Sequence, residues 1–105
     1  PLSLLLHAAL GLDGSATRED WLRVMDHLDL AWDGVHLPPD QLGVACEVFA
    51  CAIDAAEPVL VRELCARYLL PWCDTALARL PAGSAMGPVL DQFRADVTLA
   101  SAHPH

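Results

Sequence analysis

The chain contains no lysine, and its charge is strongly acidic. Its 105 residues carry six basic side chains, all arginine, against fourteen Asp and Glu, which gives a formal net charge of −8. Binding to a nucleic-acid backbone needs clustered cations, so this composition argues against a nucleic-acid partner. A partner attracted by charge would be basic. A solvated acidic surface without a charged partner is the more common explanation of the same balance.

Long hydrophobic runs are also missing from the start of the chain. The opening stretch, PLSLLLHAAL, is only ten residues long, which is too short to span a bilayer. It has neither the basic segment nor the small-residue cleavage site of a signal peptide. We therefore expect a core helix, or the end of one, at this position and no membrane insertion.

Sequence motifs of common catalytic and metal sites are absent. The four cysteines, at positions 46, 51, 65 and 73, form no C-x-x-C pair, and their apolar surroundings favour reduced, buried thiols of a cytoplasmic protein. There is no G-x-S-x-G elbow, P-loop or G-x-G-x-x-G sequence. We interpret His27 and His36 as structural rather than catalytic. These observations predict a protein that is not an enzyme and that holds no cofactor or metal.

The sequence has few signs of β-strands and many of helices. No run of alternating Val, Ile, Thr or aromatic residues is present, and no Asn-Gly or Asp-Gly pair joins two such runs. Thr17, with Asp20 three residues later, is an approximate capping box that predicts the start of a helix. The apolar face of that helix would carry Trp21, Val24, Met25 and Leu28.

The central helix is expected to begin within LPPDQ, residues 37–41. Pro39 suits the first turn of a helix, where its missing N–H would have no partner, and Asp40 adds negative charge at the positive end of the helix dipole. This helix should run to about Ala56 and is apolar on most sides, which is typical of a helix at the centre of a bundle.

Three further helices are predicted in the second half of the chain. The first covers residues 59–70, and Pro71 either kinks it or opens a short helix that runs through Leu80. A loop at 81–88 precedes the last helix, at about 88–100. We expect one all-α domain over residues 1–105, a bundle of five or six helices packed around the one that begins at Pro39.

Acidic and aromatic side chains near LPPDQ are the candidate binding residues. Asp40, Glu47 and Asp54 recur every seven residues and would form one stripe along the predicted central helix. Such a stripe is usually the solvent side of a helix, and the alternative is an acidic line that binds a basic ligand. Trp32 and Trp72 lie beside loops or proline, where tryptophan either covers a core or forms the wall of a peptide groove.

Two of these stretches together resemble a known family. GVHLPPDQLGVACEVFA, followed by ARYLLPW, is similar to the TorD/DmsD/NarJ-type chaperones of molybdoenzymes. The matching positions place residues 20–97 on the C-terminal half of that family. Gln41 and Tyr68 stand where the family has histidines. Because family members are about twice as long, the chain is expected to be a fragment or a short relative that covers its core by pairing with another copy or a partner. The positions that match the family pattern are Pro39, Asp40, Glu47, Leu69, Leu70, Pro71 and Trp72.

The resemblance implies a TorD-like helical bundle and a function in protein binding. Such a chaperone is cytoplasmic and binds an apo-molybdoenzyme precursor, through its body or its basic and hydrophobic twin-arginine leader, during molybdoenzyme maturation. Asp40 would engage a ligand arginine or hold the loop, and Gln41 would supply a hydrogen bond in place of the imidazole. The ligand-binding residues expected on this basis are Leu37, Pro39, Asp40, Gln41, Glu47 and Trp72. The alternative is a helical homodimerisation domain without a peptide ligand.

Overall fold

The computed structural model describes residues 3–30 and 38–102, and their secondary structure is helical. The all-α prediction is therefore confirmed. Leu5 and Gln41 form an isolated antiparallel bridge between two helix starts. The elements, in chain order, are α1 (Leu6–Leu10), α2 (Gly14–His27), α3 (Leu42–Asp54), α4 (Pro58–Leu64), the π-helix η1 (Cys65–Leu69), α5 (Leu70–Arg79) and α6 (Met86–Ala102).

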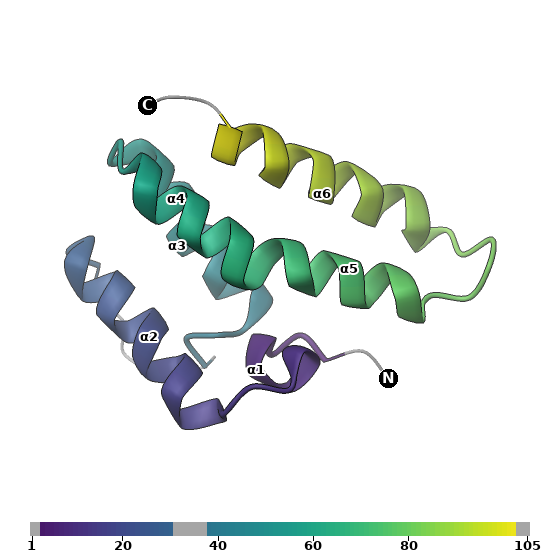
Figure 1. The fold of residues 1–105 in the computed structure, drawn as a ribbon, viewed down its shortest axis with the longest axis horizontal. Helices are drawn as coiled ribbons and strands as arrows, with labels where there is room; N and C mark the ends of the chain where they lie inside the picture. Colours follow the sequence, from purple (N-terminus) through teal and green to yellow (C-terminus); the bar gives the residue numbers. More distant parts are fainter. Residues whose placement is uncertain (1–2, 31–37, 103–105) are drawn as a thin grey trace.

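The centre of the bundle is the continuous helix formed by α4, η1 and α5 (Figure 1). Helix α6 lies alongside it and runs in the opposite direction, while α1 packs against α5 and α3 against α4 on its other sides. The prediction that α3 is the central helix is therefore wrong. The α4, η1 and α5 segments together form a helix that is longer than α3. The apolar faces of the other helices pack against different sides of this long helix.

Helix α2 begins three residues before the predicted Thr17 start. Asp13 is the N-cap, in an extended conformation, and its carboxylate accepts a 2.7 Å hydrogen bond from the Ala16 N–H. An aspartate at this position satisfies one of the free N–H groups at a helix start. The predicted apolar face is correct, because Trp21 and Met25 are buried and Val24 and Leu28 pack against the core.

Helix α3 begins at Leu42, after Pro39 and Asp40 rather than at them. Gln41 is its N-cap, and the amide oxygen of Gln41 accepts a hydrogen bond from the Val44 N–H at 3.1 Å. Pro39 and Asp40 lie in the preceding turn, and both are buried. Asp40 is therefore not part of the predicted acidic stripe, which consists only of the exposed Glu47 and Asp54.

A π-helical turn explains how Pro71 fits inside the long helix. The Leu70 N–H bonds to the Cys65 carbonyl, five residues earlier, instead of following the α-helical pattern. Proline lacks an N–H and its ring crowds the preceding turn, so the wider turn accommodates it without ending the helix. Pro71 thus lies in the first turn of α5, a continuation of α4 that ends at Arg79.

The core is one cluster that draws on every helix. The fully or almost fully buried apolar side chains include Leu6, Trp21, Ala45, Val48, Ala52, Val61, Leu64, Leu69, Trp72, Cys73 and Ala76.

Residues 3–30 and 38–102 contain no helix with both the length and the apolar character needed to cross a membrane.

Candidate functional site

Two residues singled out from the sequence, Asp40 and Trp72, both contact the N-terminal segment, residues 3–7. On one side lies the Asp40 loop, residues 38–41. The Leu6 N–H donates to the Asp40 carbonyl at 2.9 Å, and the Leu42 N–H donates to the Leu4 carbonyl at 2.8 Å. These bonds extend the bridge between Leu5 and Gln41. The Asp40 loop therefore holds the N-terminal segment through main-chain contacts.

Trp72 contacts the same segment from helix α5. Its indole Nε1 donates a 3.0 Å hydrogen bond to the Ser3 carbonyl. Only 3% of Trp72 is exposed, and its ring meets the Phe93 ring edge-on with 6.5 Å between centroids. In this arrangement Trp72 covers the core and does not form the open wall of a groove.

Asp40 forms a buried pair with His7. The Asp40 side chain is fully buried, and its Oδ2 accepts from the His7 backbone N–H at 3.0 Å and lies 2.5 Å from the ring Nδ1. The other oxygen, Oδ1, is buried and has no hydrogen-bond partner among the described residues. A Cβ at Gly14 would lie 3.1 Å from both His7 Nε2 and Arg18 Nη1, so the absence of a side chain at Gly14 leaves room for the imidazole.

The other predicted site residues that the structure describes have different environments. Gln41 caps helix α3, and Glu47 is exposed on the same helix. Leu37 lies outside the described residues, as do Trp32 and His36. The predicted set therefore combines buried structural contacts with one exposed carboxylate, rather than forming a single open surface.

His27, the other histidine considered for catalysis, pairs with a carboxylate at the protein surface. Its Nε2 lies 2.7 Å from Glu57 Oε1, and its side chain is 59% exposed. Glu57 is the residue before helix α4, so the pair joins the end of α2 to the start of α4. This contact fits the structural interpretation of His27.

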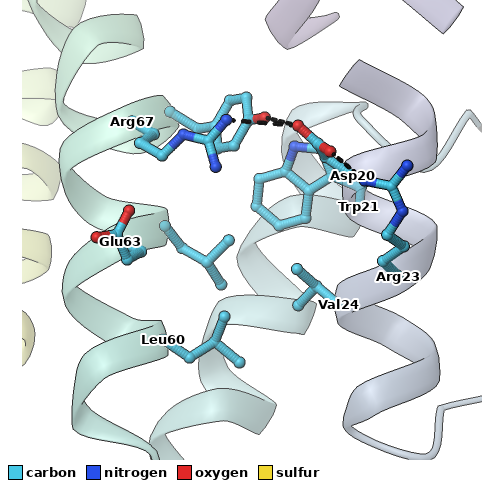
Figure 2. A pocket seen from close by; sticks show the side chains of 9 residues that line it. Asp20, Trp21, Arg23, Val24, Leu60, Glu63 and Arg67 are labelled. Carbon is cyan, nitrogen blue, oxygen red and sulfur yellow. Dashed lines mark hydrogen bonds and ion pairs between the residues drawn. The ribbon is translucent and has the colours of Figure 1, made fainter. Parts of the chain in front are cut away.

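A second candidate site lies between α2 and the α4–η1 part of the long helix; we call it the α2–α4 pocket (Figure 2). Its volume is about 170 Å³. Cavities of roughly this size hold a benzene-sized group, so the pocket suits one apolar side chain rather than a large ligand. Its apolar lining consists of Trp21, Val24, Leu60 and Leu64.

Charged groups surround one end of the α2–α4 pocket, centred on Asp20. Asp20 Oδ1 accepts from Arg23 at 2.9 Å, and Oδ2 accepts from the Tyr68 hydroxyl at 3.1 Å and from Arg67 at 3.4 Å. Figure 2 shows Asp20 between the two arginines. Glu63 also lines the pocket and makes no ion pair or hydrogen bond within the described part of the chain. The pocket thus combines apolar side chains with two carboxylates: Asp20, which is paired, and Glu63, which has no partner among the described residues.

Tyr68 lines the same pocket and is bonded to Asp20. Burial, and next the hydrogen bond to Asp20, raise the pKa of Tyr68, so its hydroxyl stays protonated and acts as a donor. The charges of Asp20 and Asp40 raise this pKa further, while that of Arg67 lowers it. The apolar face of α2 that lines the pocket was predicted from the sequence, but helical periodicity does not reveal which helix packs against it.

The four cysteines are free thiols, and two of them are less buried than expected. Cys65 and Cys73 are buried, whereas Cys46 and Cys51 are only partly buried, because α3 turns these two positions toward its side rather than its core face. Within residues 3–30 and 38–102, no three His, Cys, Asp or Glu side chains are grouped as a metal site.

In the native protein we expect iodoacetamide to modify Cys51 first and Cys73 last. Burial raises the pKa of Cys73 to about 11 and also raises that of Cys46, so both hold little of the reactive thiolate at neutral pH. Raising the pH toward 11 should accelerate modification of Cys73, because its thiolate fraction grows. Mass spectrometry of timed samples measures the order. Modification of Cys73 ahead of Cys51 would contradict this assignment.

Comparison with protein-family models gave no match for this chain, and neither did comparison with curated proteins or with solved structures.

Proposed function

We propose that this chain is a cytoplasmic, TorD-like chaperone domain that binds a basic and hydrophobic segment of an apo-molybdoenzyme and catalyses no reaction. The ligand is the twin-arginine leader or part of the enzyme body. The observation that carries the proposal is the α2–α4 pocket, where an apolar floor adjoins the carboxylates of Asp20 and Glu63. The resemblance around Asp40 and Trp72 supports the same class of protein.

The pocket has the chemistry needed for a segment that carries both arginine and leucine. Its volume of about 170 Å³ accommodates one aliphatic side chain. Glu63 is available to an arginine of the ligand, and the 3.4 Å contact from Arg67 is the longest of the three to Asp20. Because Arg23 and Arg67 already neutralise Asp20, a ligand guanidinium would pair with Glu63. The net charge of −8 attracts a basic peptide over longer distances.

The test is calorimetric titration of a twin-arginine peptide into the wild-type chain and two charge variants. We expect Glu63→Gln to weaken binding about fivefold, as for loss of one partly exposed ion pair. Glu47→Gln, which removes the same charge from the exposed side of α3, should leave the affinity unchanged. If only Glu47→Gln weakens binding, the ligand lies along α3 and not in the α2–α4 pocket. No binding to the wild type would reject the proposed function.

The apolar surface of α6 favours homodimerisation as the second candidate. Met86, Val89 and Leu99 are 50%, 55% and 59% exposed on this helix. Large exposed apolar side chains grouped on one element are typical of interaction surfaces. Light scattering separates the two candidates: a tight dimer that is indifferent to a twin-arginine peptide supports an assembly domain, and a monomer that binds the peptide supports the chaperone.

A further inference from the structure

The α2–α4 pocket has a buried floor and a more open mouth. Trp21 and Leu64 line it and are 0% and 3% exposed, whereas Val24 and Leu60 are only partly buried. Figure 2 shows Trp21 beside Asp20, with Val24 and Leu60 farther along the two helices. A group that enters between α2 and α4 therefore ends against the Trp21 side chain.

The indole of Trp21 carries a hydrogen-bond donor that is not used. Its Nε1 is buried and has no partner among the described residues. The oxygens of Asp20 already accept from two arginines and from the Tyr68 hydroxyl. The Tyr68 ring, with 5.1 Å between its centroid and that of Trp21, offers only a π-face, which is a weaker acceptor than an oxygen. Because buried polar groups in native proteins nearly always have a partner, this donor points to a ligand group.

The chemistry of that group follows from the donor and its surroundings. An arginine side chain has only donors, so it cannot satisfy the Trp21 N–H. A carboxylate would lose its hydration at the buried floor, which costs far more than burying a neutral amide. The free carboxylate of Glu63 and the net charge of −8 also oppose an anion. A neutral carbonyl next to an aliphatic group fits both the donor and the apolar lining.

We infer that the α2–α4 pocket binds one residue of a peptide through its main chain as well as its side chain. An aliphatic side chain packs against Val24, Leu60 and Leu64, and the main-chain carbonyl of the same residue accepts from Trp21 Nε1. This inference rests on the proposed function for the ligand being a peptide. It adds a contact to the peptide backbone that is independent of the arginine at Glu63.

The indole N–H signal of Trp21 in NMR spectra reports this contact directly. The probe is an acetylated and amidated peptide with paired arginines, one leucine and otherwise alanine. Trp21→Phe assigns the signal, because it removes that signal from the spectrum. We expect the peptide to move the Trp21 indole proton downfield as the hydrogen bond forms. The Trp72 indole already donates to Ser3 and should shift little, so it is the control.

A change in the peptide alone tests the carbonyl. Replacing the peptide bond after the leucine with an (E)-alkene keeps the shape and the charge of the peptide and removes the acceptor. Calorimetric titration into the wild type should show binding about tenfold weaker, as for loss of one buried hydrogen bond. The same alkene between two alanines remote from the leucine should leave the affinity unchanged. In Trp21→Phe the alkene after leucine should cause no further loss, since the donor is already absent.

The outcomes separate this inference from the proposed function. If the wild type binds all three peptides equally and the Trp21 indole signal does not move, the inference is overturned, and the proposed function stands on its own test at Glu63. Equal losses from the alkene in the wild type and in Trp21→Phe would assign the carbonyl to another donor and also overturn it. If Trp21→Phe does not fold, the comparison of peptides in the wild type decides. No binding of the parent peptide to the wild type rejects both.

Discussion

Replacing His7 with alanine is expected to lower the free energy of unfolding by about 3 kcal/mol, because the buried Asp40 carboxylate then loses its side-chain hydrogen-bond partner while its desolvation cost remains. In the wild type, the fully buried Asp40 carboxylate has His7 as its side-chain partner in the described part of the chain. After the substitution only the backbone N–H of residue 7 would remain bonded to it. Most small domains are stable by more than this, so the variant should still fold.

The reverse substitution, Asp40→Ala, is expected to cost less, about 1 to 2 kcal/mol, a value typical of lost hydrogen bonds. The remaining His7 side chain is 19% exposed, so water can reach part of the imidazole that the carboxylate leaves behind. Urea unfolding of both variants measures the difference, and the exposed Glu47→Gln serves as a control that should change little. An Asp40→Ala variant less stable than His7→Ala would show that Asp40 acts mainly through packing and not through its charge.

Replacing Trp72 with alanine is expected to cost about 3 to 5 kcal/mol, the range for removing a large aromatic side chain from a core. The substitution removes a 97% buried side chain, its edge-on contact with Phe93 and its hydrogen bond to Ser3. Thermal or urea unfolding measures the loss. A change below about 1 kcal/mol would place Trp72 at a surface, as a groove wall requires.

Trp72→Phe separates the two contributions of this side chain. Phenylalanine keeps a ring against Phe93 but cannot donate to the Ser3 carbonyl, so we expect a smaller loss, about 1 to 2 kcal/mol from the hydrogen bond and the reduced volume. The loss should be accompanied by faster hydrogen exchange at Leu6, because the N-terminal segment is then held from the Asp40 loop alone. Unchanged exchange at Leu6 would show that Trp72 does not hold this segment.

Local sequence patterns predicted correctly where helices form, but they did not predict the residues at which the helices begin. The apolar face of α2 was predicted correctly because helical periodicity depends only on neighbours three and four residues apart. Its start was not, since Asp13 caps the helix in place of the approximate capping box at Thr17. Similarly, Gln41 caps α3, and this placed Asp40 in a buried turn instead of on the helix.

For the candidate site, the sequence predicted individual stretches but not which parts of the chain they contact. LPPDQ and LLPW were predicted to carry binding residues, and Asp40 and Trp72 within them both contact the N-terminal segment. Their partners were not predicted: His7 lies 33 residues from Asp40, and Ser3 lies 69 residues from Trp72. The opening stretch was expected only to be a core helix, and nothing in its composition indicates that its backbone pairs with the Asp40 loop.

The sequence by itself determined the helical class, the apolar faces and the acidic charge of this protein, because each depends on composition or on spacing within one helix. Only the tertiary structure decided that α4, η1 and α5 form the central helix, that α2 and α4 enclose a pocket, and that Asp40 is buried against His7. These features depend on which apolar faces pack together. Many pairings of similar faces bury comparable area, so the choice among them is made by the fit of the whole core and not by any one segment.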